Sequence, residues 1–146
     1  MRLNTKMRYG TRAMLDLALR SGQGMVSLSE IAQSQEISEK YLESLFAALR
    51  AAGLVRSQRG AQGGYALARE PKAITLRELF AVLESPEPYV PCTDDHSTCH
   101  RWAGCVTQEV WAEMYAASME VLESTTLADL VARNNRRCSS ATSYDI

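Results

Sequence analysis

Three cysteines that lie close together in the sequence could bind a metal. Cys92, Cys99 and Cys105 have the spacing C-x6-C-x5-C and lie in a proline-rich stretch. Structural zinc sites pair their cysteines more closely, roughly two to four residues apart, so this spacing is a poor zinc signature. Three thiolates on a long loop suit an iron–sulfur cluster better. Zinc binding and reactive or incidental thiols remain as alternatives, and the distant Cys138 is interpreted as an exposed, incidental thiol.

The cellular compartment decides which chemistry is open to these cysteines. The chain begins with a basic segment that leads into no compact apolar signal core, and no run approaches about 18 consecutive apolar residues. We therefore expect a cytoplasmic protein without a membrane span. Thiols stay reduced in the cytoplasm, which favours metal, cluster or redox sensing over structural disulfides.

Motifs of catalysis are missing from the sequence. A thiol-based redox enzyme needs a C-x-x-C pair or a cysteine with a fixed histidine partner, and only the adjacent Cys99 and His100 faintly resemble the second arrangement. The sequence also lacks a P-loop, an HExxH motif and a glycine-rich nucleotide fingerprint. We therefore expect a protein that is not an enzyme.

The elements that would position the cysteines are mostly helical. Aromatic residues make up only 7% of the chain, and apolar residues recur at three- and four-residue steps. Three glycines in the run RGAQGG favour a β-hairpin. The predicted elements are a helix over 4–20, a short helix opened by a Ser27–Glu30 capping box, a helix from Ser38 to Gly53, a hairpin over 54–68, a helix opened by a Thr75–Glu78 capping box, a loop over 85–104, a long helix over 105–123, a last short helix opened by Thr126, and a loose tail after Arg133.

Three helices followed by a glycine-tipped hairpin is the element order of a winged helix-turn-helix. In that fold the third helix enters the major groove of DNA, and the hairpin, or wing, follows the backbone or the minor groove. Residues 1–70 carry 10 Lys or Arg against 6 Asp or Glu, whereas residues 71–146 carry 6 against 11. A basic first half suits a polyanion such as DNA. The alternative from the pattern alone is a helical bundle with an ordinary solvated face.

The predicted fold class is mainly α with a small β-hairpin, a winged helix-turn-helix head joined to a long dimerisation helix. The predicted domains are a DNA-binding domain over 1–84, a cysteine-bearing loop over 85–104, a dimerisation helix with a packing helix over 105–135, and a flexible tail over 136–146.

Polar side chains on the third helix and the hairpin are the candidate DNA contacts. Glu43 could accept a hydrogen bond from a cytosine amine in the major groove. Arg59 stands beside Gly60 in the expected tight turn, from which it could reach a narrow groove. The candidate set is Ser38, Glu39, Lys40, Tyr41, Glu43, Arg56, Arg59, Gly60 and Gln62, with Arg2, Lys6, Arg8 and Arg12 of the first helix as possible phosphate contacts.

Four stretches of the sequence resemble one bacterial family of winged-helix regulators, that of IscR, NsrR and CymR. They are MRLNTKMRYGTRAMLDLAL, ISEKYLESLFAALRAAGLVRSQRG, GGYALAR and ITLRELFAVLE, and the resemblance covers about residues 1–131. It implies a homodimer that binds double-stranded DNA through the third helix, from Ser38 to Glu43, and through the wing arginine, Arg59.

The same resemblance bears on the cysteines. Family members with three loop cysteines at about this spacing bind a 2Fe–2S or 4Fe–4S cluster, which implies that Cys92, Cys99 and Cys105 are ligands. A 2Fe–2S cluster is the favoured form of the iron–sulfur cofactor.

The fourth ligand stays open. IscR-like members use a histidine three residues after the third cysteine, and this position is Gln108 here. NsrR-like members can use an acidic residue near the position that is Arg8 here. The candidates are therefore Gln108, His96 and His100.

The long helix is apolar over a broad arc, which indicates a further packing partner. A two-fold dimer through this helix places two recognition helices about 34 Å apart, one DNA turn, and predicts a palindromic operator. The predicted function is a dimeric transcriptional regulator whose DNA binding depends on an iron–sulfur cluster that senses cluster supply, iron, redox state or nitric oxide. The alternative is a cluster-free, thiol- or partner-controlled regulator of cysteine metabolism, against which the three loop cysteines argue.

Overall fold

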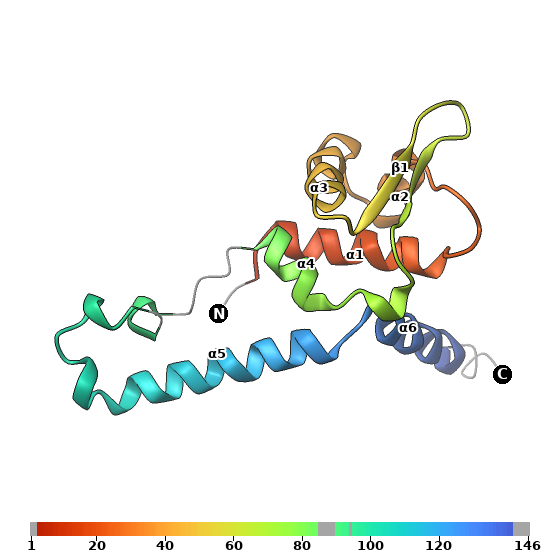
Figure 1. Cartoon of the computed structure of the whole chain (residues 1–146). Coiled ribbons are helices and arrows are strands. Elements are labelled where there is room, and N and C mark those ends of the chain that lie inside the picture. The colour runs from red at the N-terminus through yellow and green to blue at the C-terminus, as the bar shows by residue number, and fades with distance from the viewer. Residues whose placement is uncertain (1–2, 85–89, 94, 142–146) are drawn as a thin grey trace.

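A computed structural model of the chain describes residues 3–84, 90–93 and 95–141 (Figure 1). The helices and strands are α1 (Thr5–Leu19), α2 (Leu28–Gln35), α3 (Glu39–Ala51), β1 (Val55–Gln58), β2 (Gly64–Leu67), α4 (Leu76–Leu83), α5 (Val106–Ser124) and α6 (Leu127–Ala141), with short 3₁₀ turns η1 (Pro71–Ala73), η2 (Pro91–Thr93), η3 (His96–Thr98) and η4 (Trp102–Gly104). This order confirms the predicted winged helix-turn-helix followed by a long helix.

Side-chain caps explain where the helices of the head begin. Ser27 and Thr75 begin α2 and α4 with the predicted capping boxes. The hydroxyl of each accepts from the backbone amide of the glutamate three residues later, and the carboxylate of that glutamate accepts from the backbone amide of the capping residue. Ser38 caps α3. Asn4, which the sequence did not single out, caps α1 by accepting from the Met7 amide at 2.7 Å. Each such cap stabilises a helix by about 1 kcal/mol.

The hairpin is short and antiparallel, with Val55 opposite Leu67 and Gln58 opposite Gly64. Its second strand is fixed to the head by a two-way backbone pair between Val26 and Tyr65, at 2.9 and 2.7 Å. A Cβ at Gly64 would collide with the Val26 carbonyl, so only glycine permits this close approach.

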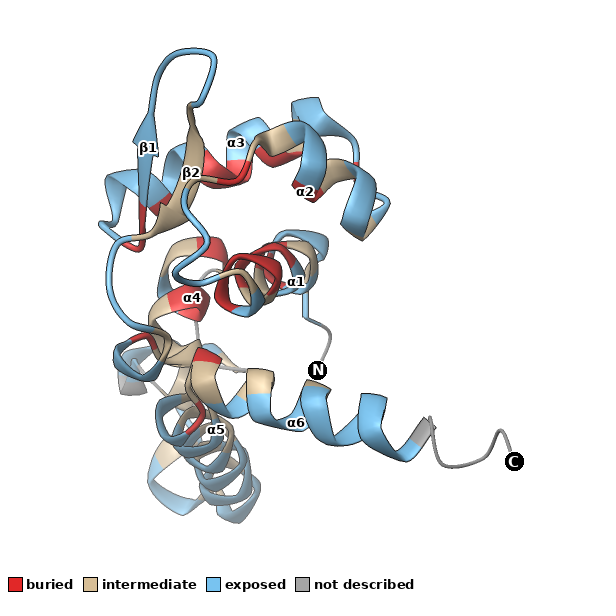
Figure 2. Ribbon diagram, turned by 90° about the vertical axis from the view of Figure 1, so that its right-hand side faces the viewer, coloured by how far each residue is buried: buried red, intermediate tan, exposed pale blue. Residues whose placement is uncertain are grey.

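The core lies where α1, α2, α3 and α4 meet beneath the hairpin (Figure 2). Phe46 packs edge-on against Tyr65 of the hairpin with ring centroids 4.7 Å apart. The largest fully buried side chains are Phe46, Met14, Ile31, Leu42, Leu49, Leu54, Ile74, Leu79 and Leu127. All but the last lie in residues 3–84, which we call the head.

The long helix α5 extends away from the head, and none of its 19 residues is buried (Figures 1 and 2). Its C-terminal end is anchored by backbone hydrogen bonds, from the Leu76 amide to the Thr125 carbonyl at 2.8 Å and from the Leu127 amide to the Ile74 carbonyl at 3.0 Å. Leu127 then enters the core, so α6 packs across α1.

The last helix is longer than the sequence indicated. A short helix followed by a loose tail after Arg133 was expected, but α6 continues to Ala141, so residues 134–141 are helical. The segment has little apolar periodicity to signal a helix, yet it contains no Gly or Pro that would end one. The rest of the expected tail, 142–146, lies outside the described residues.

Candidate nucleic-acid interface and cysteine site

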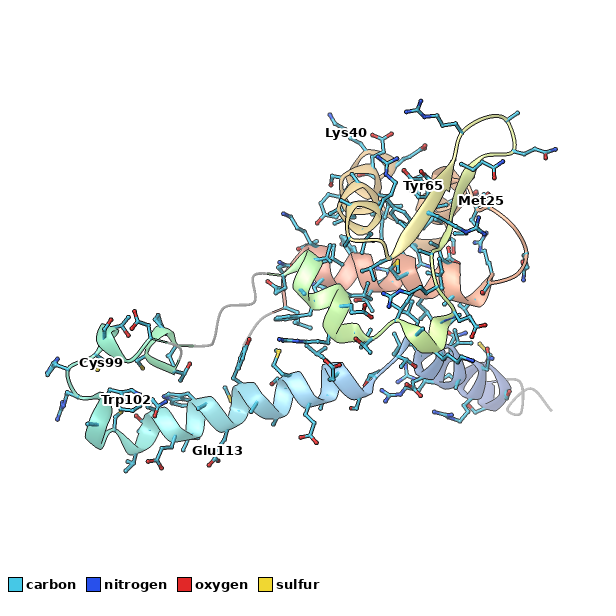
Figure 3. All side chains as sticks on the ribbon, viewed as in Figure 1. Met25, Lys40, Tyr65, Cys99, Trp102 and Glu113 are labelled. Carbon is cyan, nitrogen blue, oxygen red and sulfur yellow. The ribbon has the colours of Figure 1, made fainter. Side chains whose placement is uncertain are left out.

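Helix α3 presents polar side chains because its apolar ones are used in the core. Its buried positions, Leu42, Leu45, Phe46 and Leu49, form one stripe. Glu39, Lys40 and Glu43, predicted as DNA contacts, are exposed. Lys40 lies on the same side of the molecule as the hairpin tip (Figure 3). The fold therefore brings this end of α3 and the wing to one surface.

Two of the predicted contacts also have structural tasks. The Ser38 hydroxyl accepts from the Tyr41 amide at 3.3 Å, as its capping position requires. Tyr41 is half-buried, with its ring edge-on to Tyr9 of α1 and the centroids 6.0 Å apart. This contact joins α1 to the first turn of α3, and it limits the directions in which Tyr41 can reach DNA.

The wing separates its predicted contacts into two groups. Arg59, Gly60 and Gln62 are exposed in the connection between β1 and β2, where Gly60 has a left-handed φ of 112°. Arg56 lies lower on β1 and lines a hollow with Arg20 and the loop after α1. The tip residues therefore belong to the surface shared with α3, whereas Arg56 occupies the flank of the hairpin.

The structure shows two arginines whose hydrogen bonds stabilise the elements behind this surface. Arg50 donates from Nη1 to the Ser57 hydroxyl at 3.2 Å, which connects the end of α3 to β1. Arg12, predicted to contact phosphate, is exposed and donates to the carbonyl and side-chain oxygens of Gln35, the last residue of α2. Charge alone does not reveal such tasks, because they depend on contacts between segments distant in the sequence.

The predicted cluster ligands lie on the segment that joins α4 to α5. Cys92 is in η2, Cys99 follows η3, and Cys105 directly precedes α5. All three are free and half-exposed, and η2 packs against η3 and α5. Figure 3 shows Cys99 and Trp102 at the far end of α5 from the head. The fourth cysteine, Cys138, is exposed on α6, as expected.

Cys105 has the environment of a stabilised thiolate. Its Sγ lies 3.2 Å from the Thr107 hydroxyl. This hydroxyl and the backbone N–H of Gln108 hold the pKa of the Cys105 thiol below its usual value, with a smaller contribution from Arg101. A thiolate is the form that binds iron, so Cys105 is prepared for ligation.

The structure does not gather a complete ligand set. Within residues 3–84, 90–93 and 95–141, no three His, Cys, Asp or Glu side chains form a group that could hold a metal ion. Of the candidate fourth ligands, Gln108 is half-buried in the first turn of α5 and His100 is exposed, while the side chain of His96 is outside the described set. The three free thiols suit an iron–sulfur cluster in their chemistry.

No helix in the described part of the chain is sufficiently long and apolar to cross a bilayer.

Comparisons with known proteins agree with this arrangement. Residues 3–133 match the model of the Rrf2 family, described as iron-dependent transcriptional regulators. The regulator CymR of Bacillus subtilis is 46% identical over 130 residues, 89% of each chain. The solved structure of that CymR, described as the global cysteine regulator, superposes with a TM-score of 0.79 over 91% of this chain and 98% of its own, at 44% identity.

IscR of T. potens has a solved structure that is similar to the same degree. It gives a TM-score of 0.76 at 44% identity, over 92% of this chain and 88% of its own. The relatives are named as regulators and not as enzymes, in agreement with the prediction. This chain belongs to the Rrf2 family of transcriptional regulators.

Proposed function

We propose that this protein is a dimeric, sequence-specific regulator whose affinity for DNA is controlled by an iron–sulfur cluster on Cys92, Cys99 and Cys105. The observation that carries the proposal is the set of three free, half-exposed cysteines on the segment between α4 and α5. The lowered pKa of the Cys105 thiol adds support, because ligation requires thiolates.

DNA recognition divides between α3 and the wing. Glu43 and Lys40 are exposed toward the major groove that α3 would enter, where a carboxylate accepts from a cytosine amine and an ammonium donates to guanine. Arg59, at the glycine-bearing tip, would enter a narrow minor groove, whose negative potential attracts a guanidinium. Arg50 connects α3 to the wing through Ser57, and Arg12 of α1 fixes the end of α2 through Gln35.

The cysteine segment is connected to the head at its start. Glu84, the last described residue before it, accepts from the backbone amide of Asn4 at 3.0 Å, and the Asn4 side chain donates to the Leu83 carbonyl at 3.1 Å. Because Asn4 caps α1, a rearrangement of the cysteine segment would reach α1 through this contact. A bound cluster would supply a redox-active centre sensitive to iron supply, oxygen and nitric oxide. Gain or loss of the cluster would add or remove a cross-link in the cysteine segment. The protein would convert this change into a population shift between two arrangements of the DNA-binding heads.

Helix α5 supports a homodimer. Val106, Val110, Met114 and Val121 follow one another on one stripe, and they are 72, 53, 41 and 62% exposed. The half-buried residues of α5, such as Tyr115 and Leu122, lie on the other side of the helix. An exposed apolar stripe along a whole helix calls for a partner. A second copy would place two recognition helices on one face of DNA and favour palindromic operators.

A second function has its own support. CymR, described as a cysteine regulator, is as similar to this chain as IscR is, and no complete ligand group is formed among the described residues. A cluster-free regulator, controlled by thiol chemistry or by a partner protein, is therefore the competing proposal.

The visible absorption spectrum of protein purified without oxygen, with iron and sulfide analysis, separates the two. A broad visible band with matched iron and sulfide supports the cluster, and their ratio to protein distinguishes 2Fe–2S from 4Fe–4S. Colourless protein that iron and sulfide do not reconstitute would leave the cluster-free regulator.

A further inference from the structure

A hollow beside the base of the hairpin combines apolar and cationic side chains. It lies between the end of α1, the loop that follows α1 and the hairpin, and it has a volume of about 250 Å³. Its lining includes the apolar residues Leu17, Val26, Ala66 and Leu67 and the two arginines Arg20 and Arg56. Mostly apolar hollows with a few placed polar groups are the usual sites for small ligands.

The hollow lies on the side of the hairpin that faces away from α3. On β1, Ser57 accepts the hydrogen bond that Arg50 donates from the end of α3. Neighbouring residues of a strand point to opposite faces, so the adjacent Arg56 points away from α3. Figure 1 shows the same division, with α3 on one side of the hairpin and the loop after α1 on the other. A ligand in the hollow therefore leaves free the surface that α3 and the wing tip share.

Arg20 is fixed in the hollow by a buried carboxylate. Asp16, one turn earlier in α1, is 5% exposed and is the only buried charged residue in the described part of the chain. It accepts from Nε and Nη2 of Arg20 at 3.1 and 3.3 Å. Because breaking such a pair leaves a buried charge without a partner, Asp16 keeps the guanidinium in this position. The Nη1 group of Arg20 forms no hydrogen bond within the described residues and stays available to a ligand.

Arg56 gives the hollow its net positive charge, because Asp16 already neutralises Arg20. The Arg56 side chain is exposed, and it forms no ion pair or hydrogen bond within residues 3–84, 90–93 and 95–141. Glu30, whose carboxylate is close to Arg20, already accepts from Ser27 at the start of α2. A free guanidinium that shares a hollow with an anchored one favours an anion, and its fork of N–H groups matches a carboxylate.

The size of the hollow and its apolar lining restrict the kind of anion. Drug-sized ligands occupy about 300–1,000 Å³, so a hollow of about 250 Å³ suits a smaller molecule. An inorganic anion would leave the apolar lining in contact with water, whereas a short aliphatic chain would cover it. A carboxylate on such a chain therefore fits both parts of the hollow.

We propose that the hollow binds a small organic acid, whose carboxylate contacts Arg20 and Arg56 and whose aliphatic chain covers the apolar lining. The ligand then connects the end of α1 to the hairpin, where backbone hydrogen bonds between Val26 and Tyr65 otherwise hold the wing. A ligand that favours one position of the wing shifts the population toward it and changes the affinity for DNA. The hollow is a second input to the DNA-binding head, and it depends neither on the cluster nor on the dimer.

Butyrate, titrated into the full-length protein in a buffer free of other organic acids, tests the site. The backbone amide signals of Gly22, Gly24 and Ala66, which belong to the lining, report binding in NMR spectra and are expected to shift until they saturate. Arg56→Gln removes a charged donor and is expected to weaken binding by about tenfold or more. Arg136→Gln removes an exposed charge on α6, outside the hollow, and should leave butyrate binding unchanged.

Related probes separate the charge of the ligand from its chain. Butanol lacks the charge and butylammonium reverses it, so neither is expected to produce the saturating shifts. Acetate lacks two methylene groups and is expected to bind several-fold more weakly. Butylammonium that binds as well as butyrate would contradict an anion site, and acetate that binds as well as butyrate would contradict the apolar part. Shifts that never saturate, or an unchanged affinity in Arg56→Gln, would overturn the site itself.

Operator affinity tests the connection to the wing. At constant ionic strength, butyrate is expected to change the operator affinity of the wild type by about fivefold or more and to reach a plateau. The change should be absent in Arg56→Gln. A steady loss of affinity without a plateau would show that butyrate competes with a DNA phosphate for Arg56, which overturns the proposal. An operator affinity that butyrate leaves unchanged would overturn the role of the hollow as an input.

Discussion

The head and the segment that follows it are built on different principles. Residues 3–84 contain nearly all the buried apolar side chains, closed over a single core. The α5 arm, by which we mean the described residues 90–93 and 95–124, contains no buried residue among those whose side chains the structure describes. The head forms its fold from its own contacts, whereas the arm exposes apolar, acidic and thiol groups that find no complete environment within one chain.

This difference indicates that the head is suited to DNA reading and the arm to control. DNA reading needs side chains held in fixed positions, and the head provides them through caps, the Val26–Tyr65 pair and the Arg50–Ser57 hydrogen bond. Control needs an element whose state can change at low cost, and such elements come from the less stable parts of a protein. The arm has few buried contacts, and in the proposed function a second copy and a cluster would add contacts to it.

The largest effect is expected from the exposed stripe of α5. Val110→Asp with Met114→Asp places two charges in the proposed interface, where they would be desolvated without partners, and the dimer dissociation constant is expected to rise more than about 100-fold. Sedimentation equilibrium measures it. Ala116→Asp, exposed on the acidic side of the same helix, is the control and should leave the dimer largely intact. Unchanged association in the double variant would remove this stripe from the interface.

The cysteines come next. Cys92→Ala, Cys99→Ala and Cys105→Ala are each expected to lose most of the bound iron and the visible absorption, because each removes one thiolate ligand. Cys138→Ala, on α6 and away from the arm, should keep both. Iron analysis of the four variants purified together without oxygen provides the measurement. A colourless Cys138 variant would show that the ligand set is wrong.

A substitution of the wing arginine tests how the head binds DNA. Arg59→Ala is expected to weaken operator binding by about 1–3 kcal/mol, roughly fivefold to 150-fold, while the circular dichroism spectrum stays unchanged. Fluorescence anisotropy on an operator selected from random DNA measures the loss. Lys72→Ala, an exposed cation in η1, serves as the control and should bind normally. Equal affinities for Arg59→Ala and the wild type would exclude Arg59 from the interface.

The smallest effect concerns the stability of the head. Partial burial raises the pKa of Glu78, but the Thr75 amide and the Arg69 guanidinium, 2.6 Å away, outweigh this and hold the pKa below its usual value. A lowered pKa stabilises the fold above the unfolded value of about 4.3, and the contribution is lost as the pH falls through the lower folded value.

Glu78→Ala is therefore expected to lower the free energy of unfolding by about 1 kcal/mol at pH 7, since it removes half of a capping box that is open to solvent. The difference from the wild type should shrink below about pH 4. Urea unfolding at both pH values measures it, and a difference that grows in acid would contradict the assigned charge state.

The sequence was sufficient for most of the head because its signals are local. Ser27, Ser38 and Thr75 each indicate a helix start through a capping pattern that spans three residues, and the glycines of the wing indicate a turn. Contacts between distant segments were not accessible in this way. The Arg12–Gln35 and Tyr9–Tyr41 contacts depend on how α1 packs against α2 and α3. The length of α6 depends on the residues after Val131, which include too few apolar side chains to signal a helix.

For the cysteine site, the spacing identified three candidate ligands but not their arrangement. The lowered pKa of the Cys105 thiol arises from the Thr107 hydroxyl and the first amides of α5, which depend on where that helix begins. The fourth ligand depends on how the segment folds around its cofactor, and no local pattern around Gln108 or His100 determines that.

The central claim is that the arm controls the head through its cysteines. Operator affinity of one anaerobic preparation, measured before and after removal of iron by a chelator and again after reconstitution, tests it most directly. The account predicts a change of about tenfold or more that follows the visible absorption and reverses on reconstitution. The same operator affinity at every step, in a protein that binds and loses its cluster, would contradict it.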